Sequence, residues 1–248
     1  MIRISLSAVL VWCTALCALD GTCIAIITNG PTYKSWSSFG PLVRYEIRGD
    51  FVTAVDTLPV RKGSSPCINR SGTYYAYTRT IKDNPTNPIE LFTRVLVIRP
   101  LYGDQTAEKV IPLQTGAEWI WWVNDGTIYY SQYLTDGTNL KGQHRIRKMT
   151  LSREGGQLKV TDVAWAKMEC AAQGGFINVD GTGTKLMWAG RYSTESGGQC
   201  GDRNPAVVMT GDTTSFMDSK AVFTGGGCGF AISASGGHIT QWVGGHNV

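Results

Sequence analysis

Histidine and carboxylate side chains are the residues of this chain best suited to chemistry, and they are sparsely placed. The only histidines are His144, His238 and His246. His238 and His246 flank one expected strand, and eight strand residues would hold them about 25 Å apart, so they cannot bind the same metal ion. We therefore expect no metal, no cofactor and no catalytic residue set, and we favour a binding protein over an enzyme.

Motifs for nucleotide binding and for nucleophilic catalysis are also missing from the sequence. There is no phosphate-binding loop, dinucleotide fingerprint or Gly-x-Ser-x-Gly motif. The glycine-rich residues 225–229 lead into a strand, so no helix N-terminus follows them to hold phosphate. No Cys-x-x-Cys pair offers a zinc site. The 23 basic and 19 acidic residues are interspersed, which argues against nucleic-acid binding.

The elements that would position functional residues recur along the chain. Each of four segments combines a short apolar strand, a turn of Asn, Asp or Ser with Gly, and an aromatic strand: residues 65–79, 118–134, 174–192 and 226–245. The turn glycines are spaced by 54, 55 and 55 residues: Gly72, Gly126, Gly181 and Gly236. Two more apolar strands follow each of the first three segments. A repeat of four antiparallel strands indicates an all-β propeller with blades of about 55 residues. Unrelated hairpins in a β-sandwich are the alternative.

The N-terminal residues have a different pattern. Arg3 precedes an apolar run that extends to Leu19, which is typical of a secretory signal peptide with cleavage near Cys17 or Gly21. An uncleaved anchor is the alternative. We predict a signal peptide over residues 1–21 and a propeller domain over residues 22–248, with a partial blade at residues 22–60. The full repeat units then start near residues 65, 118, 174 and 226.

The last unit contains only two strands before the chain stops. One interpretation is a closed ring of about four blades, in which the strands before residue 65 complete the last blade. The other is a larger propeller whose later blades are absent from this sequence. We favour the second interpretation, because four-bladed rings are the rarer geometry.

Five cysteines lie outside the predicted signal peptide, and an exported protein can form disulfides. They are Cys23, Cys67, Cys170, Cys200 and Cys228. Cys170 and Cys200 lie in loops that we expect on the same face of one blade, so we predict a disulfide between them. The odd number leaves at least one thiol without a partner in this sequence. Asn69 begins a sequon that would carry a glycan only in a eukaryotic secretory pathway.

The four turns share a pattern with a known class of repeats. They read INRSGTYYAY, VNDGTIYY, NVDGTGTKLMW and ISASGGHITQW. A turn that ends in glycine and leads into an aromatic strand resembles the TolB-like and WD40-like propeller repeats, and the resemblance covers the chain from about residue 23 onward. It implies a propeller fold but no particular activity, because the signature marks a structural turn. This chain departs from the pattern in lacking Ser-Pro-Asp-Gly and in having longer blades.

Propellers usually bind ligands at one mouth of the central channel. Two kinds of loop converge there: those that lead into the first strand of each blade and those that follow the second strand. The polar and aromatic residues of these loops are our candidate ligand-binding residues: Trp36, Arg79, Glu118, Trp119, Tyr133, Glu169, Arg191, Tyr192, Arg203 and His246. Of these, Arg79, Tyr133 and Arg191 occupy corresponding positions in three blades.

The sequence thus predicts a secreted or periplasmic binding or interaction module. We expect it to be a monomer, to bind a protein or carbohydrate ligand on the channel face, and to have no membrane span once the signal peptide is removed. The alternative is a catalytic propeller that acts on polysaccharide as a lyase or hydrolase.

Overall fold

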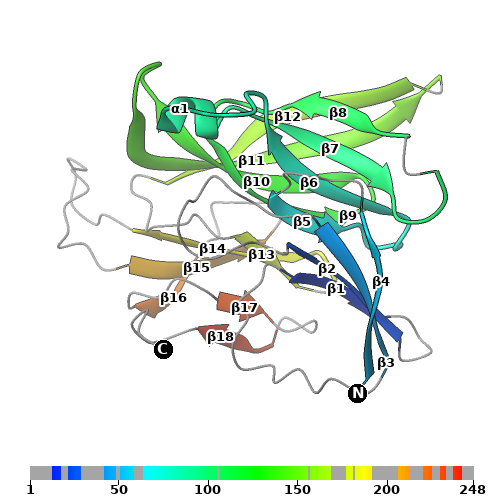
Figure 1. The fold of residues 1–248 in the computed structure, drawn as a ribbon. Helices are drawn as coiled ribbons and strands as arrows, with labels where there is room; N and C mark the ends of the chain where they lie inside the picture. The colour runs from blue at the N-terminus through cyan, green and yellow to red at the C-terminus, as the bar shows by residue number, and fades with distance from the viewer. Residues whose placement is uncertain are drawn as a thin grey trace.

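The computed structural model confirms the all-β prediction. It describes residues 13–17, 22–28, 42–48, 51–58, 64–104, 107–155, 157–168, 177–180, 182–191, 206–212, 220–224, 230–232 and 237–241. These residues form strands β1 to β18 and one short helix, α1 (Pro88–Leu91). The strands form sheets in which every neighbouring pair is antiparallel, in the order of the sequence (Figure 1).

Each of the first four sheets is one blade of four strands. Blade 1 contains β1 (Cys13–Cys17), β2 (Thr22–Thr28), β3 (Leu42–Arg48) and β4 (Phe51–Thr57). Blade 2 contains β5 (Ser64–Ile68), β6 (Tyr74–Thr80), β7 (Arg94–Pro100) and β8 (Lys109–Pro112). Blade 3 contains β9 (Ala117–Asn124), β10 (Thr127–Thr135), β11 (Leu140–Glu154) and β12 (Gln157–Met168). Blade 4 contains β13 (Ile177–Val179), β14 (Lys185–Arg191), β15 (Ala206–Asp212) and β16 (Lys220–Thr224). A fifth sheet pairs β17 (Phe230–Ile232) with β18 (Ile239–Gln241).

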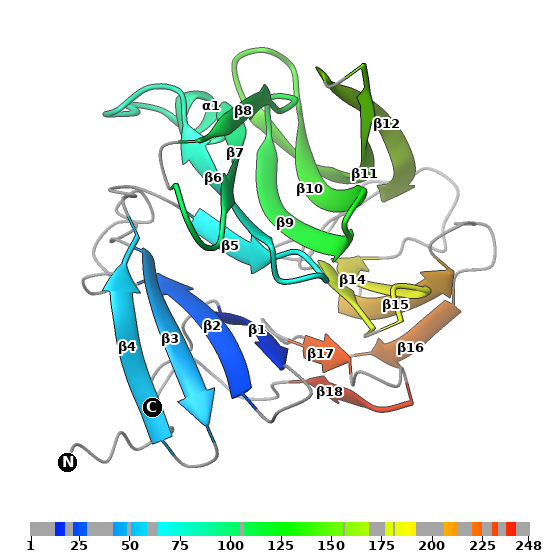
Figure 2. The same cartoon turned by 90° about the vertical axis from the view of Figure 1, so that its right-hand side faces the viewer.

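The sheets are arranged radially, which makes the fold a β-propeller. The first strand of each blade contacts the first strand of the next, because β1 lies against β5, β5 against β9, β9 against β13 and β13 against β17. These strands therefore lie innermost, and the remaining strands of each blade extend outward from them (Figure 2).

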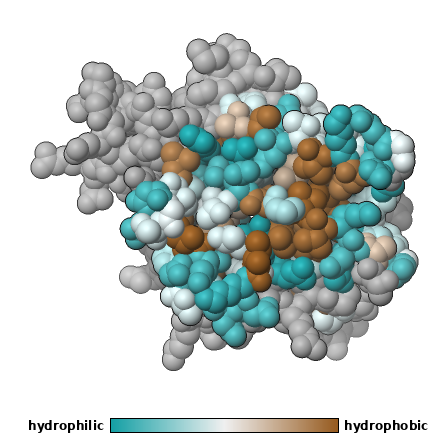
Figure 3. Space-filling view, turned by 90° about the horizontal axis from the view of Figure 1, so that it is seen from above, coloured by the Kyte–Doolittle hydropathy of each residue, from teal (hydrophilic) through white to brown (hydrophobic). Residues whose placement is uncertain are grey.

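Apolar side chains fill the spaces between neighbouring blades. Alternate residues of a strand point to opposite faces, so each sheet contributes to two cores. Trp122 is buried between blades 2 and 3, whereas Trp121 packs between blades 3 and 4 beside Tyr129. These two neighbouring residues of β9 therefore point to opposite faces of the sheet and pack in different spaces between blades. Apolar residues also reach the outer rim, where β8 and β12 lie (Figure 3).

The glycine turns lie between the first and second strands of the blades, as predicted for Gly72 and Gly126. Gly181 and Gly236 lie outside the described residues. The structure corrects one alignment, because Gly183 and not Gly181 corresponds to Gly72. Both glycines have positive φ, 67° and 74°, and both donate a backbone hydrogen bond to the residue three positions earlier. Blade 3 uses the shorter turn Asp125–Gly126, so the true spacing is irregular.

The N-terminal strands differ from the predicted partial blade. Residues 22–60 do not form an incomplete blade, because β1 pairs with β2 along its whole length and completes a four-stranded sheet. Nor do these strands complete the last blade, so the closed ring with four blades is not the arrangement found. β1 lies within the expected signal peptide, whose cleavage stays a prediction. No helix among the described residues is long and apolar enough to cross a bilayer.

Candidate functional site

The structure describes four of the predicted ligand residues with their side chains: Arg79, Glu118, Trp119 and Tyr133. Arg191 is the last residue of β14, but only its backbone is described. The others lie outside the described residues: Trp36, Glu169, Tyr192, Arg203 and His246. The two residues of the predicted disulfide, Cys170 and Cys200, also lie outside them, so their pairing stays a prediction.

Glu118 and Tyr133 meet on one end of the propeller. We call this end the loop face and define it by the connections β6–β7, β8–β9 and β10–β11, which are residues 81–93, 113–116 and 136–139. Glu118 is the second residue of β9, and only 9% of it is exposed. The Tyr133 hydroxyl, near the end of β10, donates a long hydrogen bond of 3.4 Å to Glu118 Oε1.

Arg94 is a third member of this site, and the sequence analysis missed it. It is the first residue of β7 and is 4% exposed. Its Nε donates to the carbonyl of Leu91 at 3.0 Å, and its Nη1 donates to the carbonyl of Glu118 at 3.1 Å. Arg94 precedes an apolar strand, and the sequence pattern alone marks it only as the start of that strand.

Burial lowers the pKa of Arg94 but leaves it charged. Removal from water disfavours the charged guanidinium and lowers its pKa to about 10, although Glu118 and Tyr133 act in the opposite direction. Arg94 therefore stays charged at neutral pH. The hydrogen bond from its guanidinium to the Glu118 carbonyl joins blade 2 to blade 3 at this position.

Two aromatic rings flank the charged groups. Phe92 and Tyr133 lie with their ring centroids 5.1 Å apart at an interplanar angle of 58°. The guanidinium carbon of Arg94 lies 4.9 Å from the centroid of the Phe92 ring, within the range of a cation–π contact. Because Phe92 and Tyr133 are only half-buried, aromatic surface is accessible beside the carboxylate.

The main chain of Glu118 is fixed from blade 2 as well. Ser65 Oγ donates to the Glu118 carbonyl at 3.3 Å, so this oxygen accepts hydrogen bonds from β5 and from β7. Ser65 has a φ of +50°, which is uncommon for a residue other than glycine and more so before a proline. The register of β5 against β6 shifts at this point. Backbone strain of this kind often accompanies functional sites.

Gly116 ties the two aromatic segments together. Its N–H donates to the Phe92 carbonyl at 2.9 Å, and its carbonyl accepts from the N–H of Tyr133 at 2.9 Å. Its φ is +97°, and a Cβ atom built on it would collide with the Tyr133 carbonyl. Glycine is therefore required at this position in the β8–β9 connection.

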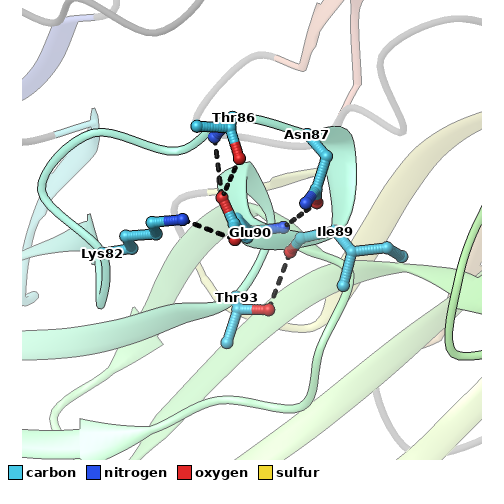
Figure 4. Close-up of polar contacts among 6 residues, drawn as sticks. All are labelled: Lys82, Thr86, Asn87, Ile89, Glu90 and Thr93. Carbon is cyan, nitrogen blue, oxygen red and sulfur yellow. Dashed lines mark hydrogen bonds and ion pairs between the residues drawn. The ribbon is translucent and has the colours of Figure 1, made fainter.

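The β6–β7 connection that carries Phe92 is ordered by its own polar contacts (Figure 4). Asn87 caps α1, because its Oδ1 accepts from the Glu90 N–H at 2.9 Å. The Glu90 carboxylate accepts from Lys82 Nζ at 2.6 Å and from the Thr86 N–H at 2.7 Å. These hydrogen bonds, led by that from Lys82, lower the pKa of Glu90 to about 2. The loop is thus held in one conformation above the site.

Arg79 and Trp119 point elsewhere. Along β6, Arg79 shares a face with Tyr75 and Tyr77, which pack toward blade 1. Its charge contributes to lowering the pKa of Tyr77, although burial raises that pKa overall. Along β9, alternation places Trp119 on the face opposite Glu118. Of the four described candidates, Glu118 and Tyr133 alone form one cluster.

The cluster of Phe92, Arg94, Glu118 and Tyr133 offers hydrogen bonding and stacking. It contains one carboxylate, one phenol and one guanidinium, which is itself held by backbone carbonyls. Among the described residues, no group of three or more His, Cys, Asp or Glu side chains could hold a metal ion. His238 is exposed in the turn before β18, on the end of the propeller opposite the loop face.

Solved structures that are similar to this chain support the propeller fold. No protein-family model and no curated protein matches the chain. A crystal structure of a nidogen/laminin complex is similar with a TM-score of 0.56 and 10% identity, covering 96% of this chain and 74% of that one. Hydrazine synthase from Kuenenia stuttgartiensis is similar with a TM-score of 0.54 and 9% identity, covering 91% of this chain and 66% of that one. At such identities the likeness concerns the fold alone.

Proposed function

We propose that this chain is an exported β-propeller that acts as a binding module, with its ligand on the loop face. The observation that carries the proposal is the cluster of Glu118, Tyr133 and Phe92, which Arg94 and Gly116 hold in place between two blades. The N-terminal residues, whose pattern is typical of a secretory signal peptide, support a place in the cell envelope or the extracellular space.

The chemistry of the cluster favours a carbohydrate over a protein ligand. A carboxylate accepts hydrogen bonds from sugar hydroxyls, and a half-buried aromatic ring stacks on the apolar face of a sugar. Tyr133 supplies a half-buried ring, and its hydroxyl lies 3.4 Å from Glu118 Oε1, the oxygen of the carboxylate that is nearer to the ligand site. The ordered β6–β7 connection would lower the entropy cost of binding, because Phe92 is already positioned.

The proposal can be tested with an array of soluble oligosaccharides. The wild-type chain should bind a defined subset of the sugars, and Tyr133→Phe should weaken that binding about tenfold, since it removes the hydroxyl that would form a hydrogen bond with the sugar and keeps the ring. Tyr102→Phe is the matched control, because Tyr102 is an exposed tyrosine in the β7–β8 turn on the opposite end of the propeller.

Three outcomes would count against the proposal. Equal binding by wild type and Tyr133→Phe would move the site elsewhere, and binding to none of the sugars would remove the carbohydrate ligand. Cleavage of a polysaccharide by the wild-type chain, lost in Glu118→Gln, would favour the catalytic alternative. Glycosidases and lyases need further acid–base groups beside one carboxylate, so cleavage would mean that other residues act together with Glu118.

A further inference from the structure

Strand β12 has an unusually long outer edge. It is the last strand of the blade 3 sheet and contains 12 residues, whereas the outer strands β4, β8 and β16 contain 7, 4 and 5. At the rise of a β-strand, 12 residues extend over about 40 Å. No described strand pairs with its outer side, so its main chain offers hydrogen-bonding groups along that length.

The same hairpin extends beyond the rest of its sheet. The first residue of β10, Thr127, pairs with Thr150, but β11 and β12 continue to pair as far as Glu154 and Gln157. The tip of the β11–β12 hairpin therefore projects past the strands that support it (Figure 1).

Apolar side chains along this edge are incompletely covered. Leu151, Leu158 and Val160 point toward blade 2 and are only partly buried against the core between blades 2 and 3. The outer strand of blade 2, β8, has only four residues, and its Ile111 belongs to the same core. On the other face of β12, Val163 is 47% exposed. Apolar residues gather in this region of the rim in Figure 3.

Positive charge is concentrated in the hairpin. Residues 140–168 contain seven basic residues, Lys141, Arg145, Arg147, Lys148, Arg153, Lys159 and Lys167, and two acidic residues, Glu154 and Asp162. Both carboxylates are engaged, because Asp162 pairs with Arg147 at 2.8 Å and Glu154 pairs with Lys159 at 3.1 Å. The whole chain has a formal charge of only +4, so this hairpin accounts for its positive excess.

Several of the basic side chains in this hairpin have no acidic neighbour in the described part of the chain. Arg145, Lys148 and Arg153 have no carboxylate partner among the described residues. Acidic groups of another molecule would supply the missing partners.

We propose that β12 is a docking edge for an extended acidic segment of a partner protein, which adds to blade 3 as a fifth strand. Main-chain hydrogen bonds to β12 would supply affinity. Alternate apolar side chains of the segment would cover Leu158 and Val160, and its acidic side chains would meet the basic residues of the hairpin. This surface lies on the rim and is separate from the proposed ligand site on the loop face.

The probe for this proposal is a labelled nine-residue peptide of alternating valine and glutamate. We expect saturable binding by fluorescence anisotropy, which weakens as salt increases, and slower amide hydrogen exchange confined to β12 and its neighbour β11. Arg153→Glu should weaken binding at least tenfold. Arg48→Glu is the matched control. Arg48 is an exposed arginine at the end of β3, the third strand of blade 1, and this substitution changes the charge by the same amount.

Control peptides separate strand addition from simple attraction between charges. A peptide of the same composition with a central proline cannot supply the full set of main-chain hydrogen bonds, and it should bind at least tenfold more weakly. Equal binding of both peptides, unchanged exchange in β12, or equal loss of affinity in Arg48→Glu would overturn the proposal. Tighter binding of a sulfated polysaccharide without protection of β12 would also overturn it, in favour of a general polyanion site.

Discussion

At the scale of single residues, the polar turns join neighbouring blades. Asn69 is 1% exposed, and its Oδ1 accepts hydrogen bonds from the N–H groups of Thr73 and Tyr74 at 2.9 and 2.8 Å. Its Nδ2 donates to Asp125 Oδ1 in the turn of blade 3 at 2.8 Å. Asp180 binds the N–H groups of Thr184 and Lys185 in the same way in blade 4. Only the amide of Asn69 can also donate to a carboxylate in the next blade.

This difference predicts the effect of Asn69→Asp. The change would place a carboxylate at the buried position 69 within hydrogen-bonding distance of the exposed Asp125 carboxylate, and it should cost about 1–3 kcal/mol of unfolding free energy at neutral pH. Protonation of one carboxyl at acidic pH would relieve the repulsion, so the deficit should shrink as pH falls and be largest near pH 7. Urea denaturation of the variant and the wild type at several pH values measures this difference in unfolding free energy.

The double variant Asn69→Asp with Asp125→Asn provides the control. It restores one donor and one acceptor across the two turns, so it should recover much of the lost stability. A deficit that does not depend on pH, or that Asp125→Asn does not reduce, would show that the contact between the two turns is unimportant. The burial of Asn69 Nδ2 also means that a glycan on this sequon would displace the contact with Asp125.

At the scale of elements, short connections decide where the candidate site forms. The β8–β9 connection has only four residues, and Gly116 within it holds both the β6–β7 connection and β10 by backbone hydrogen bonds. The strands themselves would tolerate many side chains, but this junction tolerates no Cβ atom. The position of Phe92 relative to Tyr133 therefore depends on one glycine.

We expect Gly116→Ala to destabilise the chain and to weaken ligand binding on the loop face. The substitution combines an unfavourable positive φ with a backbone collision, for a loss of about 1–3 kcal/mol. Gly137→Ala is the control, because Gly137 also has a positive φ of 92° but has open space where its Cβ would lie. Thermal unfolding compares the two variants, and equal losses would mean that strain at φ, not contact with Tyr133, explains the effect.

At the scale of the whole molecule, the inner strands form the continuous contact between blades. β1 contacts β5 of the next blade and pairs with β2 over residues Cys13–Cys17. A chain that begins at Thr22 would leave the inner edge of β2 without a partner. We expect it to melt roughly 5–10 °C lower than the chain that retains β1, as for a loss of a few kcal/mol in a domain of this size.

Calorimetry of the two chains, prepared in the same way, measures this difference. The result tests the contribution of β1 and is independent of how the chain is processed during export. Equal melting temperatures would mean that β1 adds nothing to the folded blade, and that blade 1 is stable with the three strands that the sequence analysis assigned to it.

Local patterns in the sequence are sufficient to establish the class of fold and the repeating unit. Alternating apolar residues and Gly-containing turns fix strands locally, so the hairpins at Gly72 and Gly126 were found from their patterns alone. The sequence analysis did not align Gly183 with Gly72. The two turns are matched by the side chain that accepts their backbone hydrogen bonds, and this residue is Asn69 in one turn and Asp180 in the other.

Contacts between residues of different blades could not be predicted from the sequence. Glu118 and Tyr133 were predicted as candidates, but Arg94 was not, since nothing local distinguishes an arginine that points into a space between blades from one at the surface. Likewise, β1 has the apolar composition of a signal peptide and of a buried strand, and only its pairing with β2 assigns it to blade 1. Strand formation is set by local patterns, whereas such contacts depend on how the sheets pack against one another.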